Sequence, residues 1–230
     1  MDKSLTRLKN KSMQIIKIIL ALPKTIWFNI HYLPLRQAIH LPIWIAPNCK
    51  IKIRGGVKCK AFGFASVRIG FHEVAIMEPN TKTVIKIDKG GDIEFEGTAH
   101  IGRGSKINVA NGARLLLGDN FAISASTQIN CYKSITFGRD IQFSWDCLVM
   151  DSDTHHIYDE TGKLINESRD IRFGDKVWIG CRSTILKGTV IPNGCVIGAC
   201  SLVSGKNFEE SHIITGVPAK NKKKICSWKL

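Results

Sequence analysis

The 230-residue sequence lacks the features that mark several common classes of protein. None of its eight cysteines forms a Cys-x-x-Cys pair, which argues against a zinc ribbon or a dithiol redox site. No Gly-x-Ser-x-Gly element points to a serine nucleophile. The longest apolar run, residues 13–22, contains Lys17 and is too short to cross a bilayer, and no small-residue cleavage site follows it. We therefore expect a cytoplasmic protein with buried free thiols.

Acidic residues are almost missing from the first 60 positions. This part holds 12 Lys/Arg and one acid, a net charge of +11, whereas residues 61–230 hold 21 Lys/Arg and 18 acids, a net charge of only +3. Such a concentrated charge indicates an anionic partner surface. Because no nucleic-acid-binding motif accompanies it, we expect no nucleic acid partner.

A six-residue period is the strongest pattern in the chain. Aliphatic residues stand six apart five times running, and a small residue follows four positions after each of the first four. The five are Ile179, Ile185, Ile191, Ile197 and Val203, and the small residues are Ser183, Thr189, Cys195 and Ser201. A helix or an ordinary strand has a different period. Triangular coils of three short strands explain the pattern, with aliphatic residues inside each face and small ones at the corners. The sequence thus predicts an all-β solenoid.

Related spacings extend the solenoid upstream and define its limits. Leu117, Ile123, Ile129 and Ile135 are six apart, and residues 51–69 suggest strands without a clean period. We expect the solenoid over residues 49–225, a basic N-terminal segment over 1–48 and a tail over 226–230. Residues 3–22 read as a helix that ends at Pro23. Two roles stay open for residues 1–45: peripheral contact with the inner face of the cytoplasmic membrane, or a cap on the end of the solenoid.

The period fails between Val149 and Phe173, so residues 150–172 should form a loop that leaves the scaffold. The loop begins Met150-Asp151-Ser152-Asp153-Thr154-His155-His156. Functional residues are often carried on loops that a rigid scaffold positions. An imidazole can remove a proton near neutral pH, and an aspartate can hold its other nitrogen.

These motifs resemble the hexapeptide-repeat acyltransferases, in particular sugar O-acetyltransferases of the maltose, galactoside and exopolysaccharide types. The resemblance covers roughly residues 65–225 and is carried by Trp178-Ile179-Gly180, by Ile197-Gly198-Ala199-Cys200-Ser201 and by Gly216-Val217-Pro218-Ala219-Lys220. It implies a left-handed parallel β-helix, a homotrimer with active sites between subunits, and transfer from acetyl-CoA to a sugar hydroxyl of a surface polysaccharide or its lipid-linked precursor. No metal is implied.

The resemblance also assigns roles to particular residues. His155 is the expected general base, and Asp151 and Asp153 are candidates to orient it. The candidate acetyl-CoA contacts are Cys181, Ala199, Ser204, Lys220 and Lys223. The candidate acceptor contacts are Asn130, Tyr132, His156 and Trp178. The family often carries a Thr-Lys pair where Ser204-Gly205 stands, and Lys206 could substitute for the missing lysine.

Three other functions are compatible with a β-helix. Transfer to the amine of an amino sugar would leave the same visible motifs. A non-catalytic scaffold needs no histidine loop, so the intact loop argues against it. A carbonic anhydrase needs three spaced histidine ligands, whereas this chain offers the adjacent pair His155 and His156 with His100 far upstream.

Overall fold

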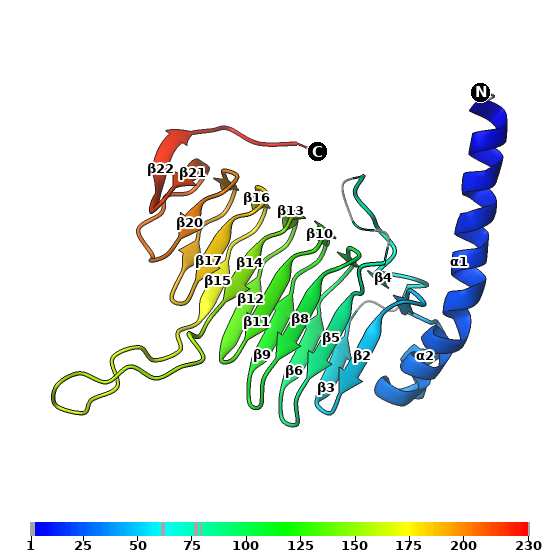
Figure 1. Ribbon diagram of the computed structural model, residues 1–230, viewed down its shortest axis with the longest axis horizontal. Helices are drawn as coiled ribbons and strands as arrows, with labels where there is room; N and C mark the ends of the chain where they lie inside the picture. The colour runs from blue at the N-terminus through cyan, green and yellow to red at the C-terminus, as the bar shows by residue number, and fades with distance from the viewer. Residues whose placement is uncertain (1–2, 61–62, 76–77, 79, 230) are drawn as a thin grey trace.

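The chain folds into a left-handed parallel β-helix with a helix across its N-terminal end (Figure 1). The computed structural model describes residues 3–60, 63–75, 78 and 80–229, with side chains from residue 16 onward. Residues 1 and 2 of the predicted N-terminal segment and residue 230 of the predicted tail lie outside the described residues. The predicted solenoid is confirmed.

Within the described residues the strands form three sheets, one on each face of the coil. The nine-stranded face contains β1 (Ile43–Ile45), β4 (Val67–Ile69), β7 (Ala99–Ile101), β10 (Phe121–Ala125), β13 (Gln142–Trp145), β16 (Trp178–Ile179), β19 (Val196–Ile197), β21 (His212–Gly216) and β22 (Ala219–Lys224). The seven-stranded face contains β2 (Lys50–Ile53), β5 (Val84–Ile87), β8 (Lys106–Val109), β11 (Gln128–Cys131), β14 (Leu148–Met150), β17 (Thr184–Leu186) and β20 (Leu202–Val203). The six-stranded face contains β3 (Gly56–Cys59), β6 (Asp92–Phe95), β9 (Arg114–Leu117), β12 (Ser134–Phe137), β15 (Ile171–Phe173) and β18 (Val190–Ile191).

Neighbouring strands pair in parallel on all three faces, and only the terminal hairpin β21–β22 is antiparallel among the described strands. This register stacks equivalent aliphatic residues from successive coils. On the nine-stranded face the stack runs through Ile101, Ile123, Phe143, Ile179 and Ile197, at intervals of 22, 20, 36 and 18 residues. Only the last coil has the three complete hexapeptides that the strict period requires. The 36-residue coil contains the predicted loop.

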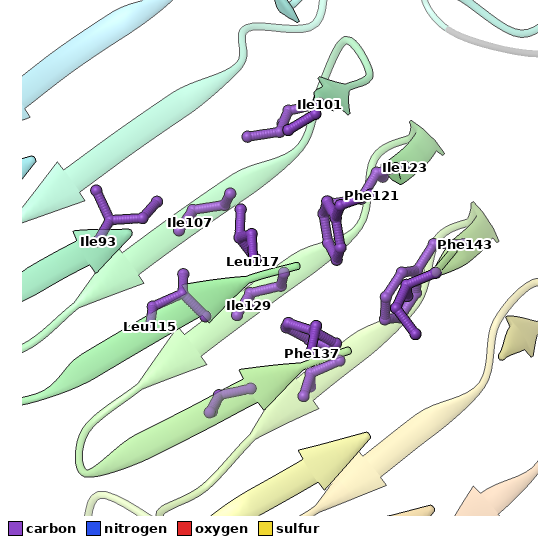
Figure 2. Packing of buried hydrophobic residues seen from close by; sticks show 14 of the residues in the cluster. Ile93, Ile101, Ile107, Leu115, Leu117, Phe121, Ile123, Ile129, Phe137 and Phe143 are labelled. Atoms are coloured by element: carbon purple, nitrogen blue, oxygen red, sulfur yellow. The ribbon is translucent and has the colours of Figure 1, made fainter. Parts of the chain in front are cut away.

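The interior is a continuous column of buried apolar side chains (Figure 2). Four phenylalanines gather in the coils next to the loop, and the rings of Phe137 and Phe173 stack with their centroids 4.8 Å apart. Phe121 and Phe143 complete this group. The small residues predicted at the corners are buried as expected, Ser183 and Thr189 at 0% exposure. Phe173 immediately follows the loop, so the aromatic group fixes the point where the chain rejoins the scaffold.

Helix α1 (Lys3–Tyr32) continues through Pro23, so the prediction that it ends there is wrong. A short helix, α2 (Leu35–Ala38), follows it. Proline removes a backbone hydrogen bond, but Pro23 is exposed, and the carbonyl that loses its donor can be hydrated. The next turns bury Thr25, Phe28 and Asn29. Packing on the β-helix therefore outweighs the local effect of the proline.

The same turns of α1 pair the edge of β1. Asn29 Nδ2 donates to the Ile43 carbonyl oxygen at 2.7 Å, and Asn29 Oδ1 accepts from the Ile43 N–H at 3.1 Å. Thr25 Oγ1 accepts from the Ile45 N–H at 3.1 Å. An open strand edge is a template for pairing with other chains, and the Thr25 and Asn29 side chains hydrogen-bond the backbone groups that this edge would otherwise leave unpaired. The capping role is confirmed. Because β1 pairs with β4, the β-helix begins ahead of the predicted boundary at residue 49.

Candidate active site

The long loop leaves the β-helix at the corner between the seven-stranded and six-stranded faces. Residues 151–170, here called the His155 loop, connect β14 to β15 and extend well beyond the scaffold (Figure 1). The Arg169 N–H donates to the Asp151 carbonyl oxygen at 3.0 Å, which closes the neck of the loop. An isolated antiparallel bridge joins Tyr158 to Leu164 farther out. The loop is therefore a hairpin-like arm with a closed base.

Asp151 is fully buried beneath this neck. Its Oδ1 accepts from the Tyr132 N–H at 2.7 Å, and its Oδ2 accepts from the N–H groups of Lys133 and Ser134 at 2.9 and 2.8 Å. Burial and the nearby Asp151 charge raise the pKa of the Cys131 thiol. The Asp151 carboxylate thus organises the preceding coil, and its oxygens are directed at backbone donors instead of at an imidazole.

Asp153 lies just outside the neck and has different partners. Its Oδ2 accepts from Lys187 Nζ at 2.5 Å and from Asn166 Nδ2 at 2.9 Å. Lys187 is 14% exposed and also donates to the Asn166 carbonyl oxygen at 2.7 Å. Hydrogen bonds from Lys187 and Asn166 lower the pKa of the Asp153 carboxyl. Together these three residues tie the start and the end of the loop to the next coil, at β17.

His155 is exposed, and its Nδ1 lies 3.2 Å from Thr154 Oγ1. The Thr154 hydroxyl donates its hydrogen to the Asp153 carbonyl oxygen at 2.6 Å. It can therefore offer His155 only a lone pair, so this network is consistent with the tautomer in which Nδ1 carries the hydrogen. That tautomer leaves Nε2 free to accept a proton. Thr154 has φ +63°, unusual for a β-branched residue, and such strain is often found at functional sites.

Other candidate residues surround the base of the loop. Asn130 and Tyr132 lie on the coil below, at β11 and the corner after it, and Tyr132 is 40% exposed. His156 Nδ1 lies 3.5 Å from the Tyr158 hydroxyl, out on the exposed part of the loop. The fold therefore brings Asn130, Tyr132, Asp153 and His155 to one corner of the β-helix.

Two adjoining hollows lie on the coils above the loop. One, of about 560 Å³, is lined by Asp153 and Lys187 as well as by residues 204–207. The other, of about 290 Å³, shares residues 204–207 and adds Lys220 on β22. Ser204 and Lys220, two of the candidate acetyl-CoA contacts, thus lie along one open surface that begins at the His155 loop, and Lys206 stands between them.

The remaining candidates lie elsewhere in this chain. Cys181 and Ala199 occupy the turns that follow β16 and β19, at the corner between the nine-stranded and seven-stranded faces. Lys223 lies opposite Ile213 in the terminal hairpin. Trp178 is on the nine-stranded face, where its Nε1 donates to Ser144 Oγ at 3.2 Å and its ring lies 6.4 Å from that of Trp228. The single chain does not bring these residues to the His155 loop.

Lys187, Asn166 and Thr154 were missed by the sequence reasoning. Lys187 carried a signal, because a lysine directly after the Ile185-Leu186 repeat is an unusual residue for a nearly buried corner. The roles of Asn166 and Thr154 depend on how the loop folds back, which the hexapeptide period does not specify.

The chain is 30% identical over 148 residues to the putative lipopolysaccharide biosynthesis O-acetyl transferase WbbJ of Escherichia coli (strain K12), covering 60% of this chain and 74% of that protein. The chain belongs to this O-acetyltransferase family. It is also 31% identical over 140 residues to the probable acetyltransferase Rv3034c of Mycobacterium tuberculosis, covering 59% of this chain but only 46% of that relative. No family model matches the sequence.

The crystal structure of the polysialic-acid-specific acetyltransferase NeuO has a similar fold. It superposes with a TM-score of 0.61 and 22% identity, covering 80% of this chain and 89% of that one. The protein thus has the solenoid that the hexapeptide pattern predicted, with the left-handed coil that the family resemblance implied. Among the described residues, no cluster of three His, Cys, Asp or Glu side chains is arranged to hold a metal, and no helix is long and apolar enough to cross a membrane.

Proposed function

We propose that this acyltransferase transfers an acetyl group from acetyl-CoA to a sugar hydroxyl of a surface polysaccharide or of its lipid-linked precursor, with His155 as the general base. The observation that carries the proposal is the His155–Thr154–Asp153 arrangement. This arrangement favours the His155 tautomer whose Nε2 has a free lone pair, and Lys187 ties the loop that carries His155 to the scaffold. Membership in the O-acetyltransferase family supports this choice of reaction.

His155 performs two proton transfers in this proposal. Its Nε2 accepts the proton of the acceptor hydroxyl as the new ester C–O bond forms. Acetyl-CoA, when bound, supplies the thioester whose C–S bond breaks. The protonated imidazole then returns its proton to the sulfur leaving group, so the base is regenerated. During the step, Thr154 Oγ1 accepts from Nδ1 and holds the ring in one orientation.

The hollows above the loop fit the chemistry of an anionic, extended donor. Lys206 and Lys220 line polar surface there and would bind its phosphate groups, and Ser204 would contact its arm nearer the loop. Cys181, Ala199 and Lys223 lie away from this surface in one chain. In the proposed homotrimer, a neighbouring subunit would bring its own copies of these residues to a shared groove. Asn130, Tyr132 and His156 remain proposed acceptor contacts, and Trp178 would act only across a subunit interface.

We place the reaction at the inner face of the cytoplasmic membrane, where lipid-linked saccharides are assembled. The strongly basic N-terminal segment supports this location because that face is anionic.

The test is substitution of His155 by alanine in the full-length protein. We expect kcat for acetyl transfer to fall by about 10²- to 10⁴-fold, with unchanged thermal unfolding because the side chain is exposed. Coenzyme A release is measured by chromatography and the acetylated sugar by mass spectrometry. Glu167→Ala, an exposed position of the same loop outside residues 156–165, is the matched control and should keep full turnover. Undiminished turnover in His155→Ala would refute the assignment.

A further inference from the structure

One face of helix α1 packs on the β-helix, and the opposite face is apolar but exposed. Ala21, Thr25, Phe28 and Asn29 are buried against the β-helix. The opposite side carries six exposed apolar residues, here called the outer stripe: Ile16, Ile19, Leu20, Ile26, Trp27 and Ile30. Their spacing of three and four residues places them on one side of the helix. Capping therefore explains one face of α1 and leaves the other unexplained.

The outer stripe is too exposed to be incidental. Leu20 is 60% exposed, Trp27 53% and Ile30 61%. Leu35 and Ile39, beyond the end of α1, are also exposed, at 71% and 67%. Soluble monomers rarely present a contiguous apolar surface of this kind unless a partner covers it.

Charge favours a lipid surface over a second copy of the chain as that partner. The α1 sequence contains six Lys/Arg and no acid. A second α1 packed stripe to stripe would offer these basic residues no acidic partner, whereas anionic lipid headgroups would attract them. Lys17 and Lys24 are already bound to protein groups, at Glu73 and at the Pro47 and Cys49 carbonyl oxygens. The remaining four basic residues lie in the first nine positions of the helix.

We propose that α1 lies along an anionic bilayer with its outer stripe among the lipid headgroups, while its opposite face holds the end of the β-helix. This inference extends the location in the proposed function to specific residues, and it does not depend on the catalytic role of His155. A long helix that is apolar along one side and strongly basic is typical of interfacial attachment.

The arrangement also sets the height of the active site. Since α1 crosses the N-terminal end of the β-helix (Figure 1), successive coils lead away from the lipid surface. Four strand spacings separate β1 from β13, the strand in the coil from which the His155 loop leaves. At about 4.8 Å each they place that coil roughly 20 Å farther out. This height favours a sugar some residues along a lipid-linked saccharide over the sugar next to the lipid.

The test is flotation of the full-length protein with vesicles. We expect binding to vesicles of equal parts phosphatidylcholine and phosphatidylglycerol, and at least tenfold weaker binding to phosphatidylcholine alone. Leu20→Glu and Ile30→Glu should each weaken binding to the anionic vesicles by about tenfold or more. Ile18→Glu is the matched control, because it adds the same charge to the same helix about 160° around the axis from Leu20. It should bind within about twofold of the unsubstituted protein.

Three outcomes would overturn the proposal. These are no flotation of the unsubstituted protein, equal losses in Leu20→Glu and Ile18→Glu, or a self-associated species in sedimentation that Leu20→Glu dissociates. Acetyl transfer to a water-soluble sugar is measured on the same samples. If the protein fails to float but still transfers acetyl groups, the membrane proposal is refuted and the proposed reaction stands. If it floats but does not transfer acetyl groups, the proposed reaction is refuted and the membrane proposal stands.

Discussion

Replacing Asp151 by asparagine tests whether this residue supports the scaffold or orients the catalytic imidazole. The carboxylate accepts three backbone hydrogen bonds while fully buried. Asparagine keeps one oxygen, which can still accept from Lys133 and Ser134, but its NH₂ group then faces the Tyr132 N–H. The substitution therefore removes at least one charge-assisted bond, worth about 1.5–3 kcal/mol, and leaves a buried donor unpaired. We expect a total loss of about 2–4 kcal/mol in the free energy of unfolding.

The measurement is urea unfolding at a fixed protomer concentration. With a slope of about 2 kcal/mol per molar urea, the midpoint should fall by about 1–2 M. Asp146→Asn is the control, because Asp146 is exposed at another corner and should stay within about 0.5 kcal/mol of the unsubstituted protein. If Asp151→Asn has the same urea midpoint as the control but loses turnover, then Asp151 acts on His155 and its scaffold role is refuted.

Two predictions concern the groups that position His155. Thr154→Val keeps the side-chain shape but removes the hydroxyl, so kcat should fall about tenfold, which corresponds to the loss of one hydrogen bond. Thr154→Ser keeps the hydroxyl and should retain normal kcat. A valine variant with normal kcat and a normal pH profile would exclude the positioning role. Lys187→Met should increase hydrogen exchange in residues 151–170 near neutral pH. Because Lys187 lowers the pKa of Asp153 below its usual 3.8, their ion pair stabilises the loop above that pH and is lost as the pH falls through the lowered pKa. Amide hydrogen exchange in residues 151–170 of the unsubstituted protein should rise as the pH falls through the lowered pKa of Asp153, whereas Lys187→Met should show little further change. If exchange depends on pH identically in the two proteins, this account is contradicted.

The hexapeptide period was sufficient to predict the stacked core because each face of each coil needs an aliphatic residue at the equivalent interior position. Ile179, Ile185 and Ile191 lie on the three different faces, as six-residue steps around a triangular coil require. The earlier coils of 20 and 22 residues hid this pattern. Their extra residues lengthen the strands, since β8 and β9 have four residues each whereas β17 has three and β18 has two. Longer strands change the spacing along the sequence and keep the parallel register between coils.

The details that escaped prediction depend on contacts between distant parts of the chain. Asp151 binds backbone N–H groups 17 to 19 residues earlier, and any residue supplies such a donor except proline. The side chains of Tyr132 and Ser134 therefore give no signal that their backbone N–H groups bind the Asp151 carboxylate. Likewise, α1 continues past Pro23 because Asn29 and Thr25 pair the edge of β1, an effect that helix-stop rules based on local sequence do not include.

The division between scaffold and loop predicts that part of the acceptor specificity lies in the loop. The coil that contains the His155 loop has 36 residues and the next has 18, so the insertion adds 18 residues while β14 and β17 still pair in register. The insertion therefore leaves the stacking that stabilises the β-helix unaltered. Asp151 and Lys187 secure the neck on both sides, which leaves the far part of the loop free to differ in sequence. Exchanging residues 156–165 should then change which sugar is used while preserving the placement of His155.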